Sequence, residues 1–217
     1  MNIALFGTSA DPPSVGHRAV IRWLADRFDR VLIWASDNPF KPDRTPLEQR
    51  TEMLALMVET LQSGQDGSPC HNVECRADLS HMRSIISVQR AKALWPQAEF
   101  TFAIGSDLIA QLPSWYRSAD LLRECSVIAI PRPGYPIDHV ALATLRSWGT
   151  VTTRRCGRPP DFIQCLPSNA EFRSDPSTDC SLHRAAKSLY FACLIACPIA
   201  CLIVGRVGDI ELIAIST

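Results

Sequence analysis

Short apolar runs alternate with longer amphipathic segments along the first two thirds of the chain. Residues 2–7 form an apolar run that ends in glycine, which is typical of a buried strand meeting a turn. After this run, Val20, Ile21, Leu24 and Phe28 recur at helical spacing with charged residues between them, and this spacing predicts an amphipathic helix. The same criteria predict further strands at residues 30–35, 72–77, 99–105 and 125–131, and further helices at residues 47–61 and 83–95.

This alternation of strands and helices predicts an α/β fold. Strand, helix and strand repeated along a chain build βαβ units, and these units assemble into a Rossmann-like parallel sheet flanked by helices on both faces. Ligands of such sheets bind beyond the carboxyl ends of the strands. We therefore expect functional residues in three segments, which are residues 7–17, 36–45 and 105–116.

The character of the sequence changes after Trp148. Residues 149–160 are basic and rich in proline, and the pattern predicts no helix or strand beyond them. Residues 189–204 are uncharged and mostly apolar but are interrupted by Pro198. A membrane span needs roughly 20 apolar residues, so this run is short. A core element, an association surface and a weak membrane anchor all remain open for it.

Composition narrows the class of protein. Apolar residues make up 47% of the 217 residues, which excludes a disordered chain. The 22 basic and 22 acidic residues balance, whereas proteins that coat nucleic acids or anionic membranes carry a basic excess. A phosphate site remains compatible with this balance because it needs only a few donors. No signal peptide is readable at residues 1–7, so we expect a cytoplasmic protein.

The nine cysteines do not form a recognisable framework. Their odd number and the expected compartment speak against a disulfide scaffold, and no paired zinc knuckles are present. We expect most of them to be small buried hydrophobes.

Residues 7–17 are the first candidate for chemistry. Small residues there let a ligand approach the backbone, and the helix that begins near Gly16 directs free N–H groups and partial positive charge at it. Phosphate is the natural ligand of such a site, and His17 in the first helical turn would donate a hydrogen bond to it. The segment is neither a Walker A loop nor a dinucleotide fingerprint. An ordinary capped turn between strand and helix remains an alternative.

The pattern Gly-x-x-x-Asp-Pro-x-x-x-Gly-His over residues 7–17 resembles the nucleotidyltransferase superfamily with the (H/T)-x-G-H motif. More narrowly, the chain is similar to bacterial nicotinate-nucleotide adenylyltransferases, and its Thr-Ser-Ala-Asp-Pro-Pro variant resembles the cyanobacterial branch. Further motifs of that family occur in the same order, namely Asn38-Pro39-Phe40-Lys41-Pro42, residues 48–53, Leu79-Ser80 with Arg83-Ser84, Gly105-Ser106-Asp107 with Trp115-Tyr116, and Arg132-Pro133-Gly134-Tyr135. The resemblance covers residues 1–148, which it marks as a nucleotidyltransferase domain, and leaves residues 149–217 as a divergent C-terminal segment.

The resemblance implies a reaction in which nicotinate mononucleotide attacks the α-phosphorus of ATP, giving deamido-NAD and pyrophosphate. It implies catalytic roles for His17, Ser14 and Lys41. It assigns ATP contacts to Gly7, Thr8, Ser9, Gly16, His17, Gly105, Asp107 and Arg173. It assigns nicotinate mononucleotide contacts to Ser84, Trp115, Tyr116 and Arg132.

Two of these roles have simpler alternatives. Trp115 would stack on the pyridine ring, or it packs under a loop as a core residue. Asp107 would contact the nucleotide, or it caps a helix, as Ser106 could equally do.

The resemblance also implies the cofactor and the partners. Mg²⁺ would arrive with ATP, held largely by phosphate oxygens and water, so we expect no dedicated protein metal site. We expect small-molecule substrates, no nucleic acid and no membrane partner, and a homo-oligomer remains open.

Two departures from the family pattern affect these expectations. Ser14 replaces the first histidine of the motif, and a hydroxyl cannot carry positive charge. Residues 168–173 retain only the Ser and Arg173 of the family's late phosphate-binding motif. A shifted reading frame after Trp148 or genuine divergence would produce this pattern. A catalytically impaired nucleotide-binding homologue, or another adenylyl- or cytidylyltransferase, is therefore the alternative.

Overall fold

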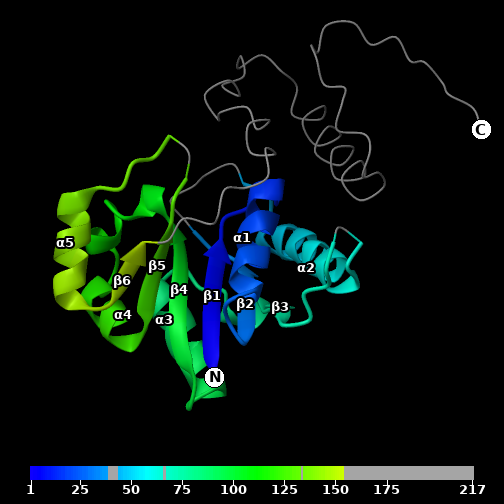
Figure 1. Cartoon of the computed structure of the whole chain (residues 1–217), viewed down its shortest axis with the longest axis horizontal. Coiled ribbons are helices and arrows are strands. Elements are labelled where there is room, and N and C mark those ends of the chain that lie inside the picture. The colour runs from blue at the N-terminus through cyan, green and yellow to red at the C-terminus, as the bar shows by residue number, and fades with distance from the viewer. Residues whose placement is uncertain (39–43, 66, 133, 154–217) are drawn as a thin grey trace, which may run out of the picture. The chain divides into compact units, whose positions relative to one another are not determined.

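The computed structural model describes residues 1–38, 44–65, 67–132 and 134–153, and these residues build a six-stranded parallel sheet with helices on both faces (Figure 1). The elements in chain order are β1 (Asn2–Thr8), α1 (Val15–Ala25), β2 (Arg30–Ala35), α2 (Leu47–Ser63), β3 (Val73–Cys75), η1 (Ala77–Leu79), α3 (Ser84–Leu94), β4 (Glu99–Gly105), η2 (Ser106–Leu108), η3 (Leu112–Ser114), α4 (Ser118–Glu124), β5 (Ser126–Ile130), α5 (His139–Trp148) and β6 (Val151–Thr153), where η marks a 3₁₀ helix. The predicted α/β class is confirmed.

The strands lie in the order β3-β2-β1-β4-β5-β6. The chain therefore builds one half of the sheet outward from β1 and then returns to build the other half outward from β4. Connections on either side of this reversal leave toward opposite faces, so a crevice opens beyond the carboxyl ends of β1 and β4. This crevice is where the segments that follow β1 and β4 meet.

Helices cover both faces of the sheet, and a separate hydrophobic core lies on each face. Ile3 and Leu5 of β1 pack in a cluster with buried residues of α3, α4 and α5. Ala4 and Phe6 of the same strand pack in a second cluster with α1 and α2. Alternate side chains of a strand point to opposite faces, so burial on both faces requires the nearly continuous apolar run seen in the sequence.

Apart from the short 3₁₀ helices η1, η2 and η3, three elements of the structure were not predicted, namely α4, α5 and β6. The helix α4 has only seven residues. The strand β6 has three, and it is a strand because Val151 to Thr153 pair with residues 127–129 of β5. Pairing with a distant segment leaves no periodic signal in so short a stretch. The sheet therefore continues past residue 148, and the apolar run at residues 189–204 lies outside the described residues.

The described part of the chain contains no helix that combines the length and apolar character needed to cross a membrane. Three cysteines fall within it as free thiols, with Cys70 and Cys125 buried and Cys75 partly buried. Burial raises the pKa of Cys75, and it raises the pKa of Cys125 to about 12. Among the described residues, no group of three or more His, Cys, Asp or Glu side chains could hold a metal ion.

The packing of β1 against β2 makes Gly7 sensitive to substitution. A Cβ at Gly7 would lie 2.8 Å from two carbons of the buried Trp34 indole. We expect Gly7→Ala to lower the free energy of unfolding by about 1–3 kcal/mol, as overpacking does, in urea titrations followed by circular dichroism. Trp34→Phe removes the indole atoms that would clash, so the double variant should lose less stability than the sum of the two single variants. Strictly additive losses would contradict this explanation.

Candidate active site

The crevice beyond β1 and β4 is lined first by His17 in the first turn of α1. The backbone N–H of Ser14 donates to the Nδ1 atom of His17 at 3.1 Å, and the Ser14 hydroxyl lies 2.8 Å from the same nitrogen. Because Nδ1 accepts the backbone hydrogen bond, the neutral ring carries its proton on Nε2. His17 thus presents Nε2–H as its donor, at a helix N-terminus whose backbone dipoles favour an anion.

His17 is neutral in this environment. Burial, and secondarily the positive charge of Arg132, lower the pKa of its imidazole from 6.5 to about 4. A neutral imidazole hydrogen-bonds a phosphate as a donor without adding a full positive charge. The influence of Arg132 also shows that the segment after β5 reaches the segment after β1.

The segments after β4 and β5 are joined by hydrogen bonds at the buried Ser106. Its hydroxyl accepts the backbone N–H of Arg132 at 2.9 Å and donates to the carbonyl of Tyr135 at 3.0 Å. The Arg132 guanidinium pairs with the Asp107 carboxylate at 3.1 Å. A Cβ at Gly105 would lie against the Asp107 carboxylate and would displace it, so glycine leaves room for this carboxylate. Asp107 is held as an anchored carboxylate at the crevice.

A second hydrogen-bond network, which no sequence motif predicted, lies at the start of α2. The Asp11 carboxylate accepts the backbone N–H of Thr45 at 3.0 Å and its hydroxyl at 2.7 Å. Arg50, only 4% exposed, donates to the carbonyls of Thr45 and Ser36, each at 3.0 Å. Together these bonds tie the segments after β1 and β2 to each other.

A signal for Arg50 was present in the sequence. Arg50 falls one turn before Leu54 on the buried face of α2, where an arginine must have partners for its guanidinium.

A third group of residues lies where α3 begins and η3 ends. Trp115 is partly buried and packs against the core under α3, α4 and α5. Tyr116 is exposed, and the Arg83 guanidinium carbon lies 3.8 Å from the centroid of its ring. Ser84, the first residue of α3, follows Arg83 directly. The contact brings Ser84 and Tyr116, which are distant in the sequence, into one neighbourhood.

The structure thus assembles most of the predicted site residues from separate elements. His17, Asp107 and Arg132 share the crevice, while Ser84, Trp115 and Tyr116 form a neighbouring group. The hydroxyl of the buried Thr8 accepts the backbone N–H of Ala10, which shapes the loop after β1. Ser9 belongs to this loop, and Gly16 lies in the first turn of α1. Lys41 and Arg173 lie outside the described residues.

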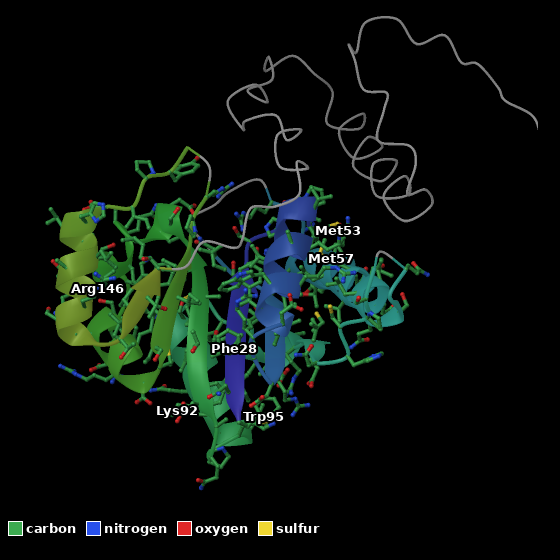
Figure 2. The ribbon with its side chains drawn as sticks, viewed as in Figure 1. Phe28, Met53, Met57, Lys92, Trp95 and Arg146 are labelled. Carbon is green, nitrogen blue, oxygen red and sulfur yellow. The ribbon has the colours of Figure 1, made fainter. Side chains whose placement is uncertain are left out.

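A separate cavity of about 350 Å³ lies at the opposite edge of the sheet. It is lined near the amino ends of β4 and β5 by residues that include Lys92, Glu99 and Glu124, and Lys92 pairs with Glu124. Figure 2 shows Lys92 and Trp95 near the amino ends of the strands. This cavity is therefore remote from the crevice that holds His17.

The arrangement at the crevice suits the positioning of phosphate rather than covalent catalysis. His17 supplies a neutral donor, α1 supplies helix N–H groups, and Arg132 supplies a cation. The carboxylate of Asp107 is partly neutralised by its ion pair. Phosphoryl transfer needs in-line positioning and charge neutralisation, and groups of this kind provide both.

A family model and two curated relatives point to the same group of transferases. A family model described as cytidylyltransferase-like matches residues 5–173. A "probable nicotinate-nucleotide adenylyltransferase" of Synechocystis is 43% identical over 157 residues, which are 69% of this chain and 76% of the relative. A protein with the same description from Gloeobacter violaceus is 31% identical over 141 residues, covering 63% of this chain and 66% of the relative.

Solved structures show the same fold. The nicotinic acid mononucleotide adenylyltransferase of Plasmodium falciparum, complexed with NaAD, matches with a TM-score of 0.61 at 20% identity. The match covers 78% of this chain and 81% of that one.

The low pKa of His17 predicts that its contribution to the free energy of unfolding depends on pH. The unfolded chain binds a proton at this residue below about pH 6.5, whereas the folded chain does so only near pH 4. The contribution of His17 to the free energy of unfolding is therefore complete above pH 6.5 and is lost as the pH falls from 6.5 toward 4. As the pH falls through this interval, we expect the free energy of unfolding of the wild type to decrease by on the order of 2 kcal/mol more than that of His17→Gln.

Urea unfolding of both proteins at pH 7, 6, 5 and 4.5 measures this shift. Other titrating groups are common to both proteins and cancel in the difference. A difference independent of pH would contradict the lowered pKa of His17.

Proposed function

The chain belongs to the cytidylyltransferase-like family and, within it, to the nicotinate-nucleotide adenylyltransferases, and we propose that it transfers the adenylyl group of ATP to nicotinate mononucleotide. An oxygen of the mononucleotide phosphate attacks the α-phosphorus of ATP. The bond from that phosphorus to the bridging oxygen of the β-phosphate breaks, and pyrophosphate leaves with the electron pair. The products are deamido-NAD and pyrophosphate, which places the protein in NAD biosynthesis. The observation that carries this proposal is the meeting of His17, Asp107 and Arg132 at the crevice between β1 and β4.

On the ATP side, His17 donates from Nε2 to a phosphate oxygen at the N-terminus of α1. Ser14 sets the direction of that donor because both its N–H and its hydroxyl meet the opposite ring nitrogen. Gly7, Thr8, Ser9 and Gly16 let the phosphates approach the backbone of the loop, and Gly105 with Asp107 contacts the nucleotide. Lys41 and Arg173 add positive charge to the phosphates.

On the acceptor side, the group around Trp115 receives the pyridine ring. An indole face suits a flat aromatic acid. Ser84 and Tyr116 recognise the substituent on that ring, and Arg132, which follows β5, adds a contact to the mononucleotide. Trp115 thus contributes to binding rather than to the chemical step.

Mg²⁺ enters as part of the Mg·ATP substrate, with phosphate oxygens and water as its main ligands. We further infer a cytoplasmic protein that acts on small molecules rather than on nucleic acid or membranes, and the family assignment leaves a homo-oligomer open.

The function is tested with the purified full-length chain, ATP, Mg²⁺ and nicotinate mononucleotide, by measuring pyrophosphate release and deamido-NAD formation. We expect release that depends on the mononucleotide. His17→Ala should lower kcat by a factor on the order of 10² or more, because a donor to the transferring phosphoryl group is lost. His139→Ala, an exposed histidine on α5, is the matched control and should retain activity.

Other outcomes of this assay would identify one of the alternative functions. Release with CTP, or with phosphopantetheine as acceptor, would identify a different transferase of the same family. No release with any acceptor, while ATP still raises the melting temperature, would identify a nucleotide-binding homologue without activity and overturn the proposal.

The role of Trp115 is tested by Trp115→Ala in steady-state kinetics. Loss of a stacking surface that binds ground state and transition state equally should raise KM for nicotinate mononucleotide and leave kcat nearly unchanged. The KM for ATP reports on the other side of the crevice and should not move. A rise in KM for ATP instead would mean that the two subsites are assigned in reverse.

A further inference from the structure

We propose that Arg83 is the residue that selects the acid over the amide mononucleotide, by pairing its guanidinium with the carboxylate on the pyridine ring. This inference rests on the proposed function. The sequence motifs did not assign Arg83 a role, and preference between the acid and the amide was not predicted.

Arg83 occupies a position that helix stability alone does not favour. It is the residue that caps the N-terminus of α3, and it makes no side-chain capping bond there. The first turn of α3 has no acidic residue. A cation at the positive end of a helix dipole is electrostatically unfavourable, and Ser, Thr, Asp or Asn are preferred at such positions. A local violation of this kind is expected where a residue serves a function.

The charge of Arg83 is not neutralised by the protein within the described residues, where no carboxylate pairs with it. Arg76, Arg117 and Arg132, by contrast, each have a carboxylate partner at 2.7–3.1 Å. Arg83 instead lies over the ring of Tyr116. Its positive charge is therefore available to an anion that comes from outside the chain.

The contact with Tyr116 also restricts the position of the guanidinium. With the carbon only 3.8 Å from the ring centroid, the ring covers one side of the guanidinium group. The N–H donors of a guanidinium lie in its plane and match the two oxygens of a carboxylate. An exposed arginine side chain is thus oriented in advance, which lowers the entropy lost when an anion binds.

The topology places this arginine at the edge of the sheet where the substrates bind. In a parallel sheet, a helix that follows a strand begins at the carboxyl edge, and α3 follows β3 in this way. Trp115 and Tyr116 follow β4 at the same edge. A ring that stacks on Trp115 therefore has an oriented cation in the same neighbourhood.

The chemistry of the two mononucleotides explains the selection. Nicotinate mononucleotide carries a carboxylate on its ring, which forms charge-assisted hydrogen bonds with a guanidinium. Nicotinamide mononucleotide carries a neutral carboxamide, whose NH₂ group would face N–H donors and leave the guanidinium unneutralised. The phosphate is common to both substrates, so it contributes nothing to the choice between them.

The test compares kcat/KM for the two mononucleotides in the wild type and Arg83→Gln. Loss of the charge-assisted bonds should lower kcat/KM for the acid about 10- to 100-fold and leave the value for the amide within about twofold, so that the selectivity ratio falls by the same factor. Arg83→Lys, which keeps the charge without the planar fork, should fall between the two. Arg123→Gln removes an exposed arginine of α4 and should leave the ratio unchanged.

The outcomes separate this inference from the function on which it rests. An unchanged ratio in Arg83→Gln overturns it, and an equal loss for both substrates overturns it in favour of a contact with the shared phosphate or a structural role. Melting temperature and KM for ATP should match the wild type, which excludes misfolding as the cause of a lost ratio. If the wild-type chain forms no deamido-NAD at all, the proposed function itself has failed.

Discussion

Parallel pairing brings the carboxyl ends of β1, β4 and β5 to one edge of the sheet, and the reversal of strand order between β1 and β4 opens that edge. His17, Asp107 and Arg132 are far apart in the sequence, yet each lies in the segment that follows one of these strands. Buried apolar side chains on both faces hold the strands in register. The hydrophobic core thus does more than stabilise the domain, because it also sets where the polar residues meet.

Within the crevice, the charged side chains of Asp107 and Arg132 act on each other and on His17. The ion pair of Asp107 and Arg132 provides both signs at one place, and Arg132 helps to keep His17 neutral. Ser14 stands where the superfamily motif has its first histidine, yet its N–H and hydroxyl both contact Nδ1 of His17. This substitution therefore retains a defined orientation of the donor and gives up one site of potential positive charge.

On the acceptor side, the proposed binding residues are held by contacts with aromatic rings and the core rather than by an ion pair. Trp115 is supported by the core, whereas Arg83 and Tyr116 meet at the surface and support each other. A guanidinium held over an aromatic ring keeps its charge and loses part of its freedom of orientation, which suits the recognition of a planar anion. Selectivity between acid and amide then depends on one charge rather than on the shape of the pocket.

The fold class, most strands and the loop of residues 7–17 could be predicted from the sequence, because apolar runs, helical periodicity and a strand–glycine–helix pattern are local signals. Strands β2 and β4 were predicted with their observed bounds. The short β6 could not be, because only pairing with β5 makes it a strand. The motifs pointed to His17, Asp107 and Trp115, but not to the bonds of Asp11 with Thr45 or to Arg83 over Tyr116. These contacts join residues far apart along the chain, so only the tertiary structure decides them, since a side chain's partner, burial and charge environment depend on which strand ends the fold places side by side.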